Sequence, residues 1–302
     1  MTDVIVIGGG TAGLTAALYL ARAGKSVAVF ECNAFGGQIV TSPKVENYPG
    51  IKEISGMDFA MGLLDQVSDL AVDFETDKIL SVSKNTDGTF TLRGEEGAYN
   101  ARAVIVATGA RCRDLGIANE GKFVGEGVSY CALCDGAFFK GKTVAVVGGG
   151  NSALEEVEYL AGICQKVYLI HRRDAFRAEQ AVVDKIKTLP NVEMLLCRTV
   201  KELIGNSALS AVRLASTTGA ADITAQLDGL FVSIGRVPDT ACVAGTVDLD
   251  AGGYIVAGED CATTVDGIFA AGDCRTKSVR QLTTAVADGA TAAVKAMEYV
   301  DR

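Results

Sequence analysis

Two cysteines and an aspartate lie close together in "SYCALCDGAFF", as Cys131, Cys134 and Asp135. A Cys-x-x-Cys pair can bind a metal, form a structural bridge, or form a disulfide that is repeatedly reduced and reoxidised. In the third case an asymmetric environment lowers the pKa of one thiol and makes it the attacking thiolate. Asp135 could then give and take a proton at the sulfur that leaves, or it could simply cap the following turn.

The remaining cysteines argue against a metal site and against a secreted disulfide framework. The chain has nine cysteines, an odd set in which only Cys131 and Cys134 have a motif-like spacing. A single histidine, His171, and the lack of a second Cys-x-x-Cys mean that a zinc site would need scattered ligands, so we expect no metal. We expect six cysteines to be inert packing residues: Cys112, Cys164, Cys197, Cys242, Cys261 and Cys274.

Length and composition indicate a globular protein of about two domains. The 302 residues are 49% hydrophobic, which is enough for buried cores. A net charge of −9 without a lysine and arginine run argues against binding to nucleic acid or to an anionic membrane. The N-terminus has no basic region before its apolar run, and no apolar stretch approaches the roughly 18 residues of a membrane span. We therefore expect a cytoplasmic protein.

The chain contains two copies of one pattern, from Asp3 to Glu31 and from Thr143 to Arg173. Each copy reads as an apolar strand, a glycine turn, a helix and a second apolar strand. In this context the first glycine allows a tight turn, the second lets a pyrophosphate approach the backbone, and the small third residue lets the helix pack on the strand. The motif residues are Gly8, Gly10 and Gly13 in the first copy, and Gly148, Gly150 and Ala153 in the second. Both copies therefore predict dinucleotide sites.

The ends of the second strands distinguish the two nucleotides. Glu31 and His171 occupy equivalent places, at the same separation from the first glycine of their motif. Glu31 suits ribose hydroxyls and would repel a 2′-phosphate. In "HRRDAFR" the carboxylate is replaced by His171, Arg172, Arg173 and Arg177, and guanidinium groups suit a phosphate dianion. The second site therefore favours NADPH, although such a cluster can also be a solvated charged face.

With these features in place, the chain resembles the low-molecular-weight bacterial thioredoxin reductases over essentially its full length. The resemblance rests on "GGGTAGLTAA", "FGGQIVTSPKVENYPG", "VIVATGA", "YCALCDG", "VVGGGNSALEE", "HRRDAFRA", "SIGRVPDT" and "DGIFAAGDCRTKSVRQLTTAVADG". Reductases of the glutathione reductase type resemble it less, because their redox cysteines lie in the first nucleotide domain, where this chain has only Cys32 after Glu31.

The resemblance implies an α/β protein with two Rossmann-like domains, the NADPH domain being inserted into the FAD domain. It implies an FAD domain at residues 1–112 and 242–302, and an NADPH domain at 113–241 that carries the cysteine pair. The residues expected at FAD are Gly8, Gly10, Thr11, Ala12, Gly13, Glu31, Gly36, Gly37, Gln38, Asn47, Thr108, Gly109, Asp273, Arg280 and Gln281. Those expected at NADPH are Gly148, Gly150, Asn151, Ser152, Ala153, His171, Arg172, Arg173 and Arg177. Without the resemblance, Asp273 reads as a helix N-terminal acid and Gln281 as a surface residue.

The activity implied by the resemblance is reduction of thioredoxin by a homodimeric enzyme. NADPH would reduce FAD, FAD would reduce the disulfide with Cys134 nearer the flavin, and Cys131 would attack oxidised thioredoxin while Asp135 moves protons. Because the cysteines lie just before the second glycine turn, they travel with the NADPH domain. We therefore expect a domain rotation, with hinges near residues 108–117 and 235–244.

Other functions of the same fold stay open at this point. The acceptor could be a peroxiredoxin, a glutaredoxin-like protein or a small dithiol, and the donor could be NADH or ferredoxin. The basic cluster argues against ferredoxin, and the absence of an N-terminal thioredoxin-like module argues against a fused peroxiredoxin reductase. Outside disulfide reduction, the chain could be a flavin-binding redox sensor, or an oxidase that forms a disulfide in a small molecule.

Secondary patterns and departures complete the prediction. Apolar and polar residues alternate on both sides of Asp87-Gly88, which predicts an antiparallel strand pair in the first domain. The strand-like runs expected to complete the second sheet are "VEMLLC", "AVRLA" and "GLFVSIG". The segment "SVRQLTTAVADGATAAVKAMEYV" predicts a long helix. Leu133 stands where the resembled family commonly has threonine, Asp239 stands where asparagine is frequent, and there is no tryptophan to suggest a partner contact.

Overall fold

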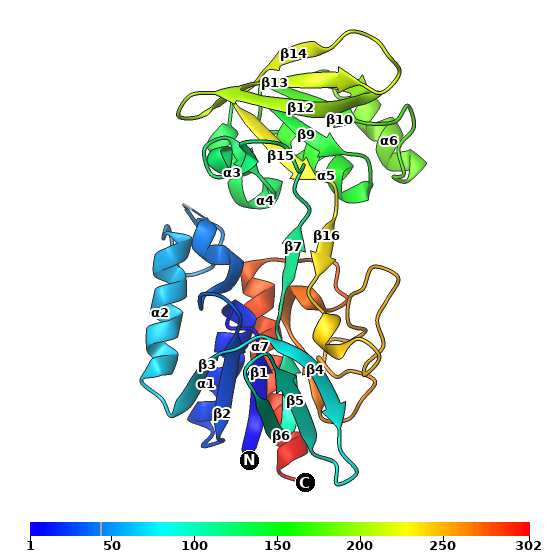
Figure 1. Cartoon of the computed structure of the whole chain (residues 1–302). Coiled ribbons are helices and arrows are strands. Elements are labelled where there is room, and N and C mark those ends of the chain that lie inside the picture. The colour runs from blue at the N-terminus through cyan, green and yellow to red at the C-terminus, as the bar shows by residue number, and fades with distance from the viewer. Residues whose placement is uncertain (43) are drawn as a thin grey trace. The chain divides into compact units, whose positions relative to one another are not determined.

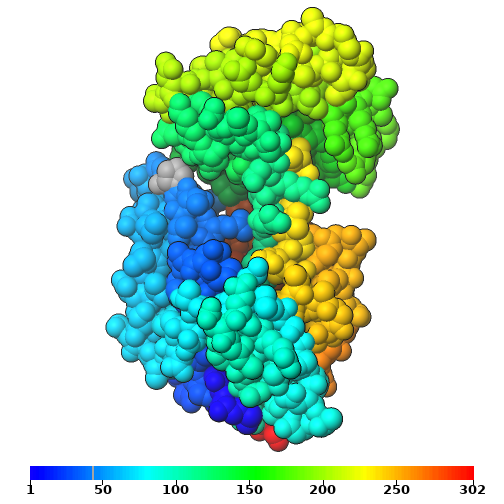
Figure 2. Space-filling model, viewed as in Figure 1, coloured from blue at the N-terminus to red at the C-terminus, as the bar shows by residue number. Residues whose placement is uncertain are grey.

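The chain forms two compact units that are discontinuous in sequence. A computed structural model describes residues 1–42 and 44–302. Unit 1 comprises Met1–Arg111 and Val237–Arg302, and unit 2 comprises Cys112–Arg236. Within unit 1, the early blue to cyan segments and the late orange segments join into one body in Figure 2, so both ends of the chain contribute to it.

Unit 1 is built on a mixed sheet in the order β3-β2-β1-β6-β5-β4, with β17 also paired to β6. The strands β1, β2, β3, β6 and β17 are paired in parallel, whereas β4, β5 and β6 are antiparallel neighbours. Its strands are β1 (Thr2–Ile7), β2 (Val27–Glu31), β3 (Val72–Thr76), β4 (Ile79–Lys84), β5 (Phe90–Gly94), β6 (Ala98–Val106) and β17 (Ile268–Ala270). Its helices are α1 (Thr11–Arg22), α2 (Gly56–Ser68) and α7 (Leu282–Val300), with short 3₁₀ turns η1 (Gly37–Thr41), η3 (Ala241–Val243) and η4 (Gly272–Cys274).

The sheet of unit 1 is buried on both faces. One core contains Val4 and Val6 of β1, Leu14 of α1 and Ala292 of α7, and Figure 1 shows α1 and α7 on that face. The other core contains Ile5 of the same strand. An apolar strand with both faces covered is typical of a parallel sheet, and small alanines let α1 and α7 pack closely. The strand pair predicted around Asp87-Gly88 is confirmed as β4 and β5, and the long C-terminal helix is confirmed as α7.

Unit 2 contains a five-stranded parallel sheet in the order β11-β10-β9-β15-β8 and a separate antiparallel sheet in the order β12-β13-β14 (Figure 1). Its strands are β8 (Val128–Ser129), β9 (Thr143–Gly148), β10 (Lys166–His171), β11 (Val192–Leu196), β12 (Arg198–Gly205), β13 (Leu209–Ser216), β14 (Ile223–Gln226) and β15 (Gly229–Ser233). Its helices are α3 (Glu120–Phe123), α4 (Ala132–Asp135), α5 (Asn151–Ala161) and α6 (Gln180–Lys187), with a 3₁₀ turn η2 (Gly136–Phe139).

One strand prediction in unit 2 is wrong. "VEMLLC" and "GLFVSIG" give β11 and β15 of the parallel sheet, but "AVRLA" lies in β13 of the antiparallel sheet. The physical reason is that β13 buries one face, as Val212 and Leu214 show, while Arg213 between them is exposed. That alternation suits a half-covered antiparallel sheet, whereas β15 is buried along most of its length. The predicted α/β class is confirmed in both units.

The chain passes between the units twice. The crossing strands β7 (Ala110–Cys112) and β16 (Arg236–Pro238) pair with each other. The return to unit 1 after Arg236 comes earlier than the predicted segment boundary at residue 241. The difference arises because η3 packs against β4 and Val243 is fully buried in the core of unit 1.

Candidate functional site

The first glycine turn has the geometry that its motif predicts. Gly8 has φ +106°, a conformation that favours glycine, and a Cβ there would overlap the backbone of Ala107. A side chain at Gly13 would overlap the carbonyl oxygen of Gly8, so α1 packs directly on the turn. The first and third glycines are therefore required by close backbone contact.

The N-terminus of α1 is open toward the turn. Gly10 is its N-cap and offers no side-chain hydrogen bond, and the first turn contains no acidic residue. Thr11 begins the helix and Ala12 is buried behind it. The first N–H groups of such a helix attract an anion, so this end suits a pyrophosphate.

Glu31 lies at the end of β2 and hydrogen-bonds to the first glycine turn. Its Oε2 accepts a hydrogen bond from the Gly9 N–H at 2.8 Å, and its Oε1 accepts one from the Asn33 N–H at 2.9 Å. The side chain is half-buried, so a carboxylate lies beside the glycine turn, where the motif places ribose hydroxyls.

The loop after β2 adds further residues expected at the flavin. The Gly36 N–H donates to the Gly9 carbonyl at 2.8 Å, and Gly37 lies so close to Gly10 that a Cβ would be 2.8 Å from its Cα. Gln38 Nε2 donates to the Ala110 carbonyl, which ties the loop to the strand that leaves unit 1. Gly37 is needed because two backbone segments approach each other closely there, and Gly36 because its φ is +114°.

The C-terminal part of unit 1 brings the late motif residues to the same region. Gln281 is the N-cap of α7 and accepts a hydrogen bond from Asn47 Nδ2 at 3.3 Å. Arg280 stacks on Tyr254 with the guanidinium carbon 4.1 Å from the ring centre, and its Nε donates to the Asp273 carbonyl at 3.4 Å. Residues that are far apart in sequence therefore meet in unit 1, as the resemblance implies.

One buried hydroxyl in this region lacks an ordinary partner. Thr108 Oγ1 is buried and forms no hydrogen bond of normal geometry with residues 1–42 or 44–302, although the Cys274 thiol lies beside it. Gly109 follows with φ +73°. A buried hydroxyl normally has a partner, so this atom fits a site that receives a ligand oxygen or nitrogen.

The second glycine turn, in unit 2, repeats the first. A side chain at Gly148 would overlap the Ser233 carbonyl, and Ala153 packs against that same position. Gly150 is the N-cap of α5 without a side-chain bond, no acidic residue lies in the first turn, and nothing lies within 4 Å of a Cβ placed on Gly150. Asn151 accepts from the Glu179 N–H at 2.8 Å, and Ser152 is exposed. The helix end is thus open to an anion.

The basic segment after β10 divides into one buried and three exposed side chains. His171 is 6% exposed, stacks on Phe176, and its Nε2 lies 3.2 Å from the Ala175 carbonyl. Burial lowers the pKa of His171, and the neighbouring arginine charges lower it further, although backbone hydrogen bonds oppose them. The histidine therefore shapes the turn, whereas Arg172, Arg173 and Arg177 are exposed charges.

The redox pair lies in unit 2, ahead of this second turn. Cys131 and Cys134 form a disulfide with 5.3 Å between their Cα atoms, which confirms that the two cysteines pair. Cys131 is the N-cap of α4, and its Sγ accepts from the Cys134 N–H at 3.2 Å. Leu133 between them is 55% exposed, and Cys134 is also exposed. Among residues 1–42 and 44–302, no group of three His, Cys, Asp or Glu side chains could hold a metal.

Asp135 completes the cysteine site. Burial raises the pKa of its carboxyl group, and a hydrogen bond from Ser129 lowers it by less. The Ser129 Oγ donates to Asp135 Oδ2 at 2.6 Å. A partly buried carboxyl group with a raised pKa next to a disulfide can carry a proton to or from a sulfur.

These features match known proteins over the whole chain. A family model described as pyridine nucleotide-disulphide oxidoreductase matches residues 2–289. Thioredoxin reductase from Listeria innocua is 42% identical over 300 residues, which cover 99% of this chain and 94% of the relative. Thioredoxin reductase from Mycoplasma genitalium is 40% identical, with 99% and 95% covered. The crystal structure of thioredoxin reductase from Streptococcus pyogenes superposes with a TM-score of 0.95 at 38% identity, covering 100% and 98%.

The chain belongs to the thioredoxin reductase family of pyridine nucleotide-disulphide oxidoreductases. The resemblance noted in the sequence is thereby confirmed, and the chain is an oxidoreductase of a family that uses a flavin, a pyridine nucleotide and a redox-active disulfide. None of the helices described for this family member is both long and apolar enough to cross a membrane.

Four of the six cysteines expected to be packing residues are buried in the cores of this family member. Burial raises the pKa of Cys164 and Cys274 to about 11, and that of Cys242 and Cys261 to about 12. A thiol with a raised pKa is rarely a thiolate near neutral pH and reacts slowly. These four cysteines therefore suit packing rather than redox chemistry.

Sequence reasoning missed the group that holds the Asp273 segment. Asp288 of α7 accepts hydrogen bonds from the Gly272 N–H at 2.9 Å, from Arg275 Nε and Nη2 at 2.9 and 2.8 Å, and from Lys277 Nζ at 2.8 Å. Burial would raise the pKa of Asp288, but the bonds from Arg275 and Lys277 outweigh it and lower the pKa. The sequence did offer a signal, because an alanine-rich helix is expected to be buried and an aspartate on it then needs a hydrogen-bonding or charged partner.

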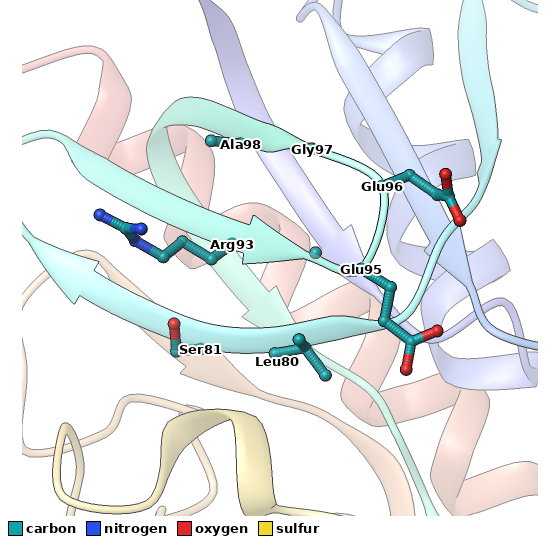
Figure 3. A pocket seen from close by; sticks show the side chains of 8 residues that line it. Leu80, Ser81, Arg93, Glu95, Glu96, Gly97 and Ala98 are labelled. Carbon is teal, nitrogen blue, oxygen red and sulfur yellow. The ribbon is translucent and has the colours of Figure 1, made fainter.

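A hollow on unit 1 lies apart from these motifs. It has a volume of about 460 Å³ and is formed by β4, β5 and the turn before β6. Figure 3 shows that Arg93, Glu95 and Glu96 point in different directions around it. It contains none of the residues expected at either cofactor, and polar groups do not converge in it, so we assign it no role.

Proposed function

We propose that this chain is an NADPH-dependent thioredoxin-disulfide reductase. The observation that carries the proposal is the Cys131–Cys134 disulfide, with a partly buried Asp135, in the same unit as a glycine turn followed by exposed arginines. The relatives at about 40% identity are named thioredoxin reductase, which supports thioredoxin as the protein substrate.

We propose that unit 1 holds FAD. The open N-terminus of α1 suits the pyrophosphate and Glu31 suits the ribose. The buried Thr108 hydroxyl forms no ordinary hydrogen bond within the described part of the chain, and a ligand could supply one. Asp273, Arg280 and Gln281 would contact the ribityl chain and the ring. The remaining residues assigned to FAD are Gly8, Gly10, Thr11, Ala12, Gly13, Gly36, Gly37, Gln38, Asn47 and Gly109.

We propose that unit 2 holds NADPH at the second glycine turn. The open end of α5 suits the pyrophosphate, and Arg172, Arg173 and Arg177 would bind the 2′-phosphate. His171 would support this corner through its packing against the turn rather than through charge, because it is buried and its pKa is lowered. Gly148, Gly150, Asn151, Ser152 and Ala153 complete the assignment.

When both cofactors are bound, hydride from NADPH would reach the flavin and two electrons would pass to the disulfide. Reduction breaks the bond between Cys131 and Cys134. Cys131, as a thiolate, then attacks the disulfide of oxidised thioredoxin, forming a mixed disulfide and releasing one partner sulfur. Cys134 attacks the Cys131 sulfur next, which frees the reduced partner and restores the bond. Asp135 takes or gives the protons that accompany these exchanges.

A domain rotation is part of the proposal. The disulfide and the proposed NADPH site belong to unit 2, whereas the proposed FAD site belongs to unit 1. One flavin face cannot easily receive the nicotinamide and the disulfide together, so unit 2 would present them in turn, with β7 and β16 as the hinge. Oxidised and reduced structures with one common orientation, in which both groups contact the flavin, would refute the rotation.

An anaerobic titration tests the donor, the flavin and the acceptor together. The purified protein should show a flavin spectrum that NADPH bleaches and that oxidised thioredoxin restores, with NADPH consumed in equal amount. If NADH or reduced ferredoxin bleaches the flavin and NADPH does not, the electron donor is not NADPH. If the flavin is reduced but thioredoxin does not reoxidise it, thioredoxin is not the substrate. Glutaredoxin-like proteins, peroxiredoxins and small disulfides would then be tested as acceptors. The family also supports a homodimer, which a sedimentation mass near twice 31.3 kDa would verify.

A further inference from the structure

The Ser129 hydroxyl connects two parts of the cysteine site. Ser129 ends β8 and is 5% exposed. Its Oγ donates to Asp135 Oδ2 at 2.6 Å and accepts from the Cys131 N–H at 3.1 Å. One buried hydroxyl therefore holds both the carboxyl group proposed to carry the proton and the backbone of the cysteine proposed to attack the partner.

The Asp135 side chain has no second partner of this kind. Within residues 1–42 and 44–302, Ser129 is its one hydrogen-bond partner, and burial and Ser129 account for the direction of its pKa. The helix packed on α4 is α5, which carries Glu155, Glu156 and Glu158, and none of them bonds to Asp135. Next to Ser129, the Tyr130 hydroxyl donates instead to Glu120. Removing one hydroxyl therefore removes the hydrogen bond that Asp135 accepts from the described residues.

We propose that Ser129 is a positioning residue that orients Asp135 and sets the pH at which this carboxyl group exchanges its proton with the cysteine sulfurs. The inference rests on the proton role proposed for Asp135. When a bond to a cysteine sulfur breaks, Asp135 gives its proton to the departing sulfur and becomes a carboxylate, and the Ser129 O–H stabilises that charge. In the reverse direction, the carboxylate takes the proton from a thiol as the new S–S bond forms.

A hydroxyl that donates to a carboxylate favours the ionised form, so its loss must raise the pKa of Asp135. Hydrogen bonds to a charged group are strong enough to move a pKa by about one unit. Ser129→Ala should therefore move the Asp135 transition upward by about one pH unit and lower kcat, with little change in the KM for thioredoxin. A residue that merely supports the fold would lower the rate at every pH without moving the transition.

The experiment compares four forms of the FAD-bound protein across pH. They are the parent, Asp135→Asn, Ser129→Ala and the control Ser210→Ala, which removes an exposed hydroxyl that donates to the Ile204 carbonyl at 3.1 Å. The Asp135 transition is the step in the plot of kcat against pH that the parent shows and Asp135→Asn lacks. Infrared spectra follow the same group directly through the carboxyl band that Asp135→Asn lacks. Ser129→Gly replaces Ser129→Ala if the latter does not fold, because both remove the hydroxyl.

The outcomes separate this inference from the proposed function. An upward shift in both profiles with Ser129→Ala, and none with Ser210→Ala, supports Ser129 as the positioning residue. A normal Asp135 transition in Ser129→Ala overturns it while leaving the proton role of Asp135 intact. No transition attributable to Asp135 in the parent overturns both. The infrared titration requires neither NADPH nor thioredoxin, so a wrong donor or acceptor would not affect it.

Discussion

Asp288→Asn should destabilise unit 1 far more than a change to a surface charge. The Asp288 side chain is 9% exposed, and it forms ion pairs with Arg275 and Lys277, whose side chains are 5% and 7% exposed. Removing one partner of a buried ion pair costs about 3–5 kcal/mol, because the other charge stays buried without compensation. An amide can still accept from the Gly272 N–H, so we expect a loss of about 3 kcal/mol in the free energy of unfolding, at the lower end of that range.

A matched control lies on the same helix. Lys295 and Glu298 form an ion pair at 2.8 Å, but their side chains are 40% and 52% exposed. Exposed pairs contribute about 0–1 kcal/mol, so Glu298→Gln should change the free energy of unfolding by less than about 1 kcal/mol. Adding Lys277→Met to Asp288→Asn should recover part of the loss, because it removes one of the two uncompensated cations.

The pH dependence of the free energy of unfolding follows from the direction in which the pKa of Asp288 is shifted. The pKa of Asp288 is lowered in the folded protein, so its contribution is fully present above the unfolded value of about 4 and is lost as pH falls through the folded pKa. The difference between the parent and Asp288→Asn should thus be largest near neutral pH and shrink in acid. The assay is urea unfolding at fixed FAD concentration, followed by circular dichroism and by the fluorescence of released FAD. Equal destabilisation by Asp288→Asn and Glu298→Gln would refute the reasoning.

Three further predictions address the proposed chemistry. Arg172→Ala with Arg173→Ala should raise the KM for NADPH at least tenfold by an order-of-magnitude estimate and that for NADH much less, and equal effects in steady-state assays would exclude a 2′-phosphate site. Cys131→Ser should leave flavin bleaching by NADPH intact and abolish thioredoxin turnover, so retained turnover would exclude Cys131 as the attacking thiol. Leu133 is exposed beside the disulfide, where the proposed protein partner would cover it. Leu133→Thr should therefore lower kcat/KM for a protein disulfide by about threefold to tenfold, while a small aromatic disulfide should react unchanged.

The parts that could be predicted from the sequence are those whose chemistry is local. Gly8, Gly13 and Gly148 are fixed by backbone crowding within one turn, and Cys131 and Cys134 lie within one turn of helix. Such constraints involve residues close together in the sequence, so the residue types and their spacing reveal them. The wrong placement of "AVRLA" had a different origin, since a short apolar run does not state which sheet it joins.

The residues that sequence reasoning missed hold the expected site residues in place without being site candidates themselves. Ser129 precedes Asp135 by six positions and Asp288 follows Gly272 by sixteen, and each contact depends on how a strand or helix is placed by the core. The burial of His171 is of the same kind, because it results from packing against Gly149 and Phe176. A buried polar side chain normally has a hydrogen-bond partner, and Ser129 and Asp288 have theirs in groups of the proposed sites. Changes at Ser129 should therefore alter the pH profile and changes at Asp288 the free energy of unfolding, although neither residue was among those expected at a site.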